Sequence, residues 1–257
     1  MESEYREVRR LIGAAPRCTS ASTAPTDGSA PVAPTASSRC EAPQELEAEG
    51  TAFGLHIVLS RCGIGKVNAA LGAAELLRRH RPDAVVSTGV AGGISPELRP
   101  MDLVVARQTL YHDVWCGDGN ERGQVQGLPP RFDAHPALLE ALAPLLTPTD
   151  GVAGDAPDAR LVAGVICTGD QFITDRDALQ HIRRQFPDGT AVDMESAAIA
   201  HACFLAGVPF VSLRIVSDTP GSTPDHRQQY AHFWDELSRR SFVALQRCLE
   251  ALSHARL

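Results

Sequence analysis

Acidic side chains follow two apolar runs of the sequence. The segment Asp193-Met194-Glu195-Ser196 separates a short apolar run from an apolar helix, and Asp218 follows the run Phe210–Val216. A carboxylate at the start of a helix can be a simple cap, but capping does not need Met between two acids. A carboxylate here could instead accept hydrogen bonds from two adjacent hydroxyls of a sugar. Asp218 is a candidate general acid, because burial can raise the pKa of a carboxyl group.

Glycine-rich segments follow two other apolar runs. Gly63-Ile64-Gly65-Lys66 comes after the strand-like run Leu55–Leu59, and Thr88–Gly93 contains three Gly in six residues. Glycine lets the backbone approach a ligand closely, although either segment could be a plain turn. The first segment is not a P-loop, which needs Ser or Thr at Val67, nor a dinucleotide fingerprint, which needs a third Gly at Asn68.

The remaining polar motifs point away from several enzyme classes. Arg214 lies inside an apolar run, where it needs a partner, so we expect a structural ion pair. Neither G-x-S-x-G nor H-E-x-x-H occurs, and the cysteines form no C-x-x-C. His112-Asp113 is expected to be a surface pair. The sequence therefore predicts no metal and no cofactor.

The composition limits the partners and the compartment. The chain has 257 residues, a net charge of −7 and a mean hydropathy of −0.10. The negative charge argues against nucleic acid as a partner, and no apolar run is long enough to span a membrane. The N-terminus is charged, unlike a secretory signal, and seven widely spaced Cys are typical of reduced thiols. A soluble, cytoplasmic protein is predicted.

Short apolar runs alternate with amphipathic segments from about Thr51 onward. Such alternation predicts an α/β fold with a mostly parallel sheet and ligands beyond the carboxyl ends of its strands. We expect strands at Leu55–Leu59, Ala84–Ser87, Leu103–Ala106, Leu161–Cys167, Ala191–Met194 and Phe210–Val216, and helices at Val67–His80, His135–Leu146, Asp175–Phe186, Ser196–Ala206 and Tyr230–Ala255. Seventeen of the twenty residues 19–38 are Ala, Ser, Thr or Pro. Residues 19–43 are therefore expected to be a disordered loop.

Taken in order, these motifs resemble the purine nucleoside phosphorylase/uridine phosphorylase superfamily, most closely its methylthioadenosine/S-adenosylhomocysteine nucleosidases. The matching segments are Gly63–Val67, Thr88–Gly93, Tyr111–Asp113, Gly169–Ile173, Ala191–Glu195 with Ala198–His201, and Arg214–Asp218. The resemblance implies one domain over residues 1–257, a three-layer α-β-α sandwich with a central mixed sheet, and a homodimer. It also implies hydrolysis of the N-glycosidic bond of methylthioadenosine or S-adenosylhomocysteine, releasing adenine.

The resemblance assigns roles around the purine and the sugar. Asp218 would protonate N7 of the leaving adenine, Phe172 would stack on the base, and the backbone of Ile173 would read its edge. Glu195 would hold the ribose hydroxyls above Met194. The resemblance also implies that the wall of the pocket around the 5′ substituent and the sugar is formed by Ile64, Val90 and Phe233. The implied supporting residues are Arg214, Ser217, Gly89 and Gly92.

The resemblance also implies a base that activates water, the last glutamate of a Met-Glu-x-Glu motif after the family's first strand. Met1-Glu2-Ser3-Glu4 matches this motif, which makes Glu4 the expected base. The strand that precedes the motif in the family is absent from the sequence. We therefore expect the true start to lie upstream, or the chain to be a truncated form, because a lost central strand leaves backbone groups unpaired.

Two residues differ from those of the phosphorylases and indicate which nucleophile attacks the sugar. Ser87 stands where those enzymes place an Arg, and Val90 offers no hydroxyl to a phosphate. Phosphate recognition needs such donors, so water is the expected nucleophile. Phosphorolysis, hydrolysis of a futalosine-type nucleoside and binding of a purine nucleoside without catalysis remain as alternatives.

Overall fold

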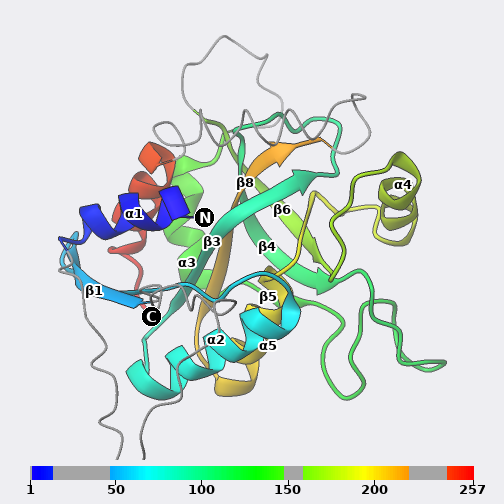
Figure 1. Ribbon diagram of the computed structural model, residues 1–257, viewed down its shortest axis with the longest axis horizontal. Coiled ribbons are helices and arrows are strands. Elements are labelled where there is room, and N and C mark those ends of the chain that lie inside the picture. The colour runs from blue at the N-terminus through cyan, green and yellow to red at the C-terminus, as the bar shows by residue number, and fades with distance from the viewer. Residues whose placement is uncertain (1, 14–46, 148–158, 220–241) are drawn as a thin grey trace, which may run out of the picture.

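A mixed β-sheet forms the centre of the molecule (Figure 1). The computed structural model describes residues 2–13, 47–147, 159–219 and 242–257. Within them six strands have the order β5-β4-β6-β7-β3-β8. Their bounds are β3 Val85–Gly93, β4 Leu103–Tyr111, β5 Phe132–Asp133, β6 Leu161–Thr168, β7 Ala191–Asp193 and β8 Phe210–Asp218.

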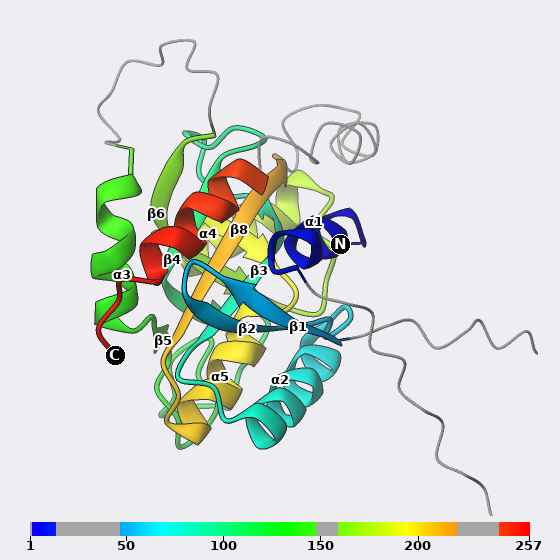
Figure 2. The same cartoon turned by 90° about the vertical axis from the view of Figure 1, so that its left-hand side faces the viewer.

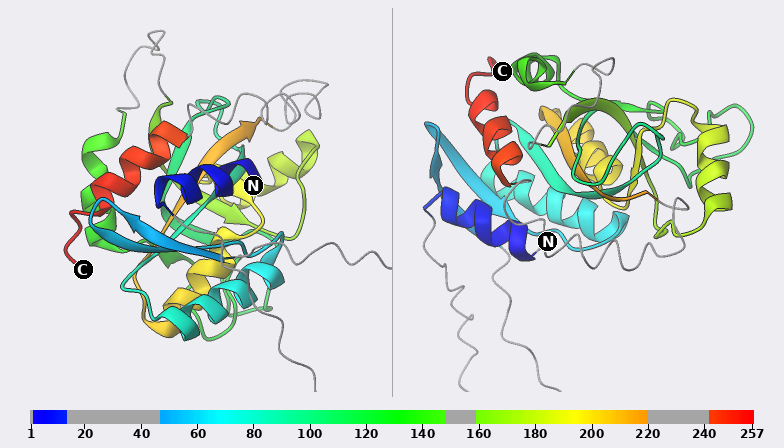
Figure 3. Two further views of the ribbon diagram at one scale, coloured as in Figure 1. Left: turned by 60° about the vertical axis from the view of Figure 1, so that its left-hand side comes forward. Right: turned by 90° about the horizontal axis from the view of Figure 1, so that it is seen from above.

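The sheet closes on itself, because β8 pairs with β4 as well as with β3. Leu103 of β4 lies opposite Ile215 of β8 in this antiparallel contact. Apolar side chains of five strands form one buried cluster inside the closed sheet, and half of them are alanines: Ala91, Ala106, Ala191, Val104, Ile166 and Val216. Because side chains alternate between the two faces of a strand, the neighbours of these residues face the helices outside. The small inner residues allow the sheet to curve this tightly (Figure 3).

Helices cover the outer faces of the closed sheet. Helix α2 (Lys66–His80) packs against α5 (Ser196–Ala206), while α3 (Pro136–Leu142) and the helix at residues 242–252 lie on another side (Figure 2). Helix α4 (Arg176–Gln185) covers β6 and β7 through Leu179 and Ile182. A 3-10 turn, Ala143–Leu145, follows α3.

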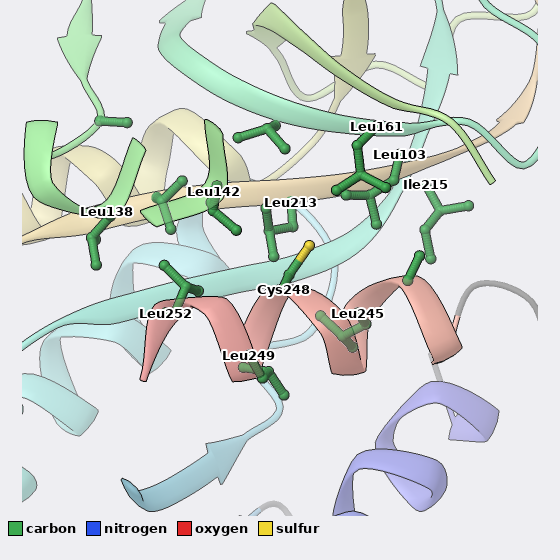
Figure 4. Close-up of a cluster of buried hydrophobic side chains, with 14 of the residues drawn as sticks. Leu103, Leu138, Leu142, Leu161, Leu213, Ile215, Leu245, Cys248, Leu249 and Leu252 are labelled. Atoms are coloured by element: carbon green, nitrogen blue, oxygen red, sulfur yellow. The ribbon is translucent and has the colours of Figure 1, made fainter. Parts of the chain in front are cut away.

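The largest core cluster lies between the sheet and the C-terminal helix (Figure 4). Its buried side chains come from the N-terminal residues Val8 and Ile12, from α3, from three strands and from residues 242–252. They include Leu138, Leu142, Leu103, Leu161, Leu213, Ile215, Leu245, Cys248, Leu249 and Leu252. These segments are far apart in the sequence, so their burial depends on the closed sheet.

None of the described helices is long and apolar enough to cross a membrane.

A small unit packs beside the sheet. It consists of helix α1 (Glu2–Leu11) and the hairpin of β1 (Glu47–Ala52) with β2 (Leu55–Ser60). The carbonyl oxygen of Ile12 accepts a hydrogen bond from the Thr51 amide at 3.1 Å. Gly50 allows this contact, since a Cβ there would lie 2.1 Å from the same oxygen. The α1 helix and strand β1 were not anticipated from the sequence pattern.

Most of the expected elements are confirmed. The long pairings β3–β8 and β4–β6 and the short pairing β6–β7 are parallel, while β7 runs antiparallel to β3, so the sheet is mostly parallel and also mixed, as the family resemblance implies. The Gly-rich segment after Ser87 is not a loop, because β3 continues to Gly93. Residues 19–43 and residues 230–241 of the expected helix at Tyr230–Ala255 lie outside the described residues. Of the rest of that helix, residues 242–252 are helical.

Candidate active site

A pocket lies along β3, where residues Ser87–Gly92 line it together with residues at the carboxyl ends of β7 and β8. The segments that follow β2 and β6 complete its wall. Its lining residues are Cys62, Gly63, Ile64, Ser87, Thr88, Gly89, Val90, Ala91, Gly92, Gln171, Phe172, Ile173, Val192, Asp193, Met194, Glu195, Ile199, Arg214, Ser217 and Asp218. The pocket therefore gathers nearly all of the expected site residues from five separate stretches of the chain.

Asp218 is the last residue of β8 and is 95% buried, with 5% of its surface exposed. The hydroxyl oxygen of Ser217 lies 2.5 Å from Asp218 Oδ1 and 3.3 Å from the carbonyl oxygen of Ala91. Because Ser217 is itself held by β3, it fixes the direction of the carboxyl group. A buried carboxyl at the mouth of a strand, with one oxygen held in place, can donate a proton to a bound ligand.

Asp193 and Arg214 form a buried ion pair in the wall of the pocket. Arg214 Nε donates to Asp193 Oδ2 at 2.8 Å, and Arg214 Nη2 donates to Ser87 Oγ at 3.0 Å. Gly89 leaves room for the guanidinium, since a Cβ there would lie 3.2 Å from Arg214 Nη1. The expected structural pair for Arg214 is thus present, and its partner is the first acid of the segment Asp193–Ser196.

Three polar groups complete the surroundings of Asp193. Thr168 donates to Asp193 Oδ1 at 2.6 Å, and both the amide and the hydroxyl of Ser196 donate to Oδ2, at 3.0 and 2.5 Å. Asp193 therefore caps the start of α5, whereas Glu195 makes no side-chain cap contact. The two acids, adjacent in sequence, have separate tasks.

Glu195 faces the pocket from the start of α5. Its Oε1 accepts a hydrogen bond from the Gly65 amide at 2.9 Å. Burial raises the pKa of Glu195 above its ordinary value of 4.5, although Arg214 counteracts this effect. An oriented carboxylate in a shielded pocket can accept hydrogen bonds from adjacent hydroxyls.

Most of the other expected residues line the pocket, whereas two are not part of its described lining. Phe172 and Ile64 line the pocket and are 60% and 57% exposed, so a ligand could cover both. Ile173, Val90, Met194 and Gly92 line it as well. Glu4 lies in helix α1, but its side chain, like Phe233, is outside the described residues.

Sequence reasoning missed part of the site. Cys62 and Gln171 line the pocket, and burial raises the pKa of the Cys62 thiol. Both stand next to residues that the motifs had singled out, Gly63 and Phe172. Adjacency to a Gly-rich turn or an aromatic residue could therefore have identified them.

The comparison with known families agrees with this geometry. The model of the phosphorylase superfamily matches residues 35–250. The chain therefore belongs to the phosphorylase superfamily. It is 43% identical over 191 residues to the 5′-methylthioadenosine/S-adenosylhomocysteine nucleosidase of Geobacillus thermodenitrificans, covering 72% of this chain and 78% of that protein. The nucleosidase of Chromohalobacter salexigens is 39% identical over 68% of this chain and 72% of its own length.

Solved structures of nucleosidases are also similar to this chain. The nucleosidase of Colwellia psychrerythraea in complex with adenine is 30% identical, with a TM-score of 0.79 over 100% of this chain and 94% of that chain. The nucleosidase of Neisseria meningitidis in complex with methylthio-immucillin-A is 29% identical, with a TM-score of 0.77 over 98% and 96%. The futalosine hydrolase of Helicobacter pylori is 22% identical over 97% and 94%, with a TM-score of 0.75, and shares the fold.

Removing the charge of Asp193 tests the buried ion pair. We expect Asp193→Asn to lower the free energy of unfolding by about 3–5 kcal/mol, because Arg214 would be left as an uncompensated buried charge. Chemical denaturation measures this value. The matched control is Asp188→Asn, which breaks the surface pair with Arg131 and should cost no more than about 1 kcal/mol. Equal losses in the two variants would contradict the central role of the pair.

Glu195→Gln tests whether Glu195 serves folding or function. A carboxyl whose pKa is raised by folding contributes stability below its unfolded pKa and loses it as the pH rises through the folded value. At pH 7 Glu195 therefore opposes folding, and the variant should melt at the same or a higher temperature than the wild type. The difference should vanish below about pH 4.5. A clearly lower melting temperature at pH 7 would mean that Glu195 is a structural cap.

Proposed function

We propose that this protein hydrolyses the N-glycosidic bond of 5′-methylthioadenosine and S-adenosylhomocysteine, releasing adenine and a 5-thio-ribose. The observation that carries the proposal is the placement of Glu195 and Asp218 in one pocket with the exposed ring of Phe172. One carboxyl group can serve the sugar and the other the base. The named nucleosidases among its relatives support the same substrates.

Each group has a defined task in this reaction. Asp218 donates a proton to N7, so that adenine leaves as a neutral molecule, and Ser217 keeps its carboxyl group directed into the pocket. As the bond to N9 breaks, positive charge develops on the ribose. Glu195, oriented by Gly65, holds the ribose hydroxyls and stabilises that charge. Water then attacks C1′, with Glu4 as the proposed base.

The described pocket favours water over phosphate as the nucleophile. Arg214 is the only cation among the described lining residues, and its guanidinium is engaged by Asp193 and Ser87. Val90 supplies no hydroxyl at the centre of β3. A phosphate dianion needs several donors that are not already committed. Hydrolysis therefore fits this arrangement better than phosphorolysis.

We expect the protein to release adenine from methylthioadenosine at the same rate with and without phosphate. A coupled assay for free adenine measures the rate. The variant Asp218→Asn should reduce kcat by about 10²–10⁴, because it lacks the proton for N7. The control variant Asp188→Asn, on the surface, should keep the wild-type rate.

Three outcomes would contradict this assignment. Release that requires phosphate would make the protein a phosphorylase. Adenine binding without turnover of methylthioadenosine would favour a futalosine-type substrate or a binding protein. An unchanged kcat in Asp218→Asn would remove Asp218 as the acid.

The proposed active form is a homodimer that uses the outer face of α2. Val67 and Leu71 are one turn apart on this helix and are 69% and 65% exposed. They continue the line of Ile64 at the pocket rim, which is 57% exposed. Exposed apolar side chains gathered on one helix face are typical of a protein–protein interface. A two-fold contact through this face would cover it in both copies.

We expect sedimentation velocity to show a dimer for the wild type. Leu71→Glu should shift the protein to a monomer, because two like charges would meet near the two-fold axis. The control is Glu250→Ala, on the C-terminal helix and away from α2, which should remain dimeric. A monomeric wild type at micromolar concentration would contradict the proposal.

A further inference from the structure

A cluster of charged side chains lies just behind the pocket wall. We call Lys66, Asp113 and Asp170 the Lys66 cluster. Lys66 Nζ donates to both oxygens of Asp113 at 2.8 Å, and the Lys66 amide donates to Asp170 Oδ1 at 2.7 Å. The Asp170 amide in turn donates to Asp113 Oδ2 at 2.9 Å. None of these three residues lines the pocket among the described residues, so direct contact with a ligand does not explain the cluster.

The cluster contacts the peptide next to the one that donates to Glu195. Gly65 and Lys66 carry consecutive amides at the start of α2: the first donates to Glu195 Oε1 and the second to Asp170 Oδ1. Gly65 has a φ of 90°, a backbone conformation that glycine adopts readily. A Cβ on Gly65 would lie 3.1 Å from Asp170 Oδ1, so the aspartate sits tightly against this turn. The direction of the Gly65 amide therefore depends on Asp170.

The setting of the cluster differs from that of an ordinary surface ion pair. The side chains of Lys66 and Asp113 are 22% and 20% exposed. The hydrogen bonds join three separate segments: the start of α2, the end of β4 and the stretch after β6 that leads to Phe172. Burial alone would raise the pKa of Asp113, but the hydrogen bonds from Lys66 and the Asp170 amide outweigh it and keep the pKa low. Asp113 is therefore ionised at neutral pH.

We infer that Asp170, supported by Lys66 and Asp113, is a positioning residue that holds the Gly65 amide against Glu195. The inference rests on the proposed function, because Glu195 is taken to bind the ribose. Asp170 then determines how well the sugar part of a nucleoside is held. It contributes little to the adenine part, since the Asp170 amide remains bonded to Asp113 whatever side chain stands at position 170. The segment that leads to Phe172 keeps that anchor.

The test compares the variant Asp170→Ala with the wild type for two ligands. One is adenine, and the other is a methylthioadenosine analogue in which a carbon–carbon bond replaces the glycosidic bond. We expect calorimetry to show that Asp170→Ala binds the analogue about tenfold more weakly than the wild type does, which corresponds to the loss of one charge-assisted hydrogen bond. The affinity for adenine should change by less than about twofold. Asp170→Asn keeps an acceptor oxygen for the Lys66 amide and should restore most of the affinity.

A matched control is Asp188→Ala, which removes an aspartate paired with Arg131 outside the pocket and should change neither affinity. Unchanged binding of the analogue by Asp170→Ala would overturn the inference, and so would a parallel loss for both ligands. Equal affinities of the wild type for adenine and the analogue would overturn it as well. A wild type that binds the analogue more tightly than adenine but releases no adenine from methylthioadenosine would overturn the proposed function alone. The ratio of the affinities of Asp170→Ala and the wild type for each ligand would still decide the role of Asp170.

Discussion

The buried pair of Arg214 and Asp193 is the interaction on which the rest of the site depends. It lies where β3, β7, β8 and the start of α5 meet, and its two side chains are 2% and 0% exposed. Charges removed from water this completely are tolerated only when their hydrogen bonds are satisfied. Ser87, Thr168 and Ser196 meet that need. Since these partners come from separate elements, the pair fixes the backbone from which the pocket residues project.

The environment gives three nearby acids different properties. Asp193 has its oxygens engaged in the core and caps a helix. Glu195, two residues later, faces the pocket, where burial raises its pKa and one backbone amide orients it. Asp218 is held by its neighbour Ser217 at the end of a strand. The same chemical group is thus a structural counter-ion at Asp193 and, in the proposed reaction, a sugar ligand at Glu195 and an acid at Asp218, because solvent access and hydrogen-bond donors differ among them.

The closed sheet explains why small residues gather behind the pocket. Ala91, Ala106 and Ala191 point into the enclosed space, and Gly89 makes room for the Arg214 guanidinium. Larger side chains at these positions would force the strands apart, because protein interiors have little free volume. β3 can therefore run through its Gly-rich segment as a strand and present its backbone to the pocket. The apolar stretch of small residues is a packing requirement as much as a ligand-binding one.

Local sequence patterns were enough to predict the α/β class, most element positions and the two segments that carry Glu195 and Asp218, because periodicity, helix signals and strand-end acids are local properties. The order of the motifs also indicated the family. The closure of the sheet, the capping of α5 by Asp193 rather than Glu195, and the contact of Asp170 with Gly65 are visible only in the folded structure. These features depend on contacts between residues far apart in the chain. Such contacts are set by strand direction and by which donors meet each carboxylate in space, and neither leaves a pattern along the sequence.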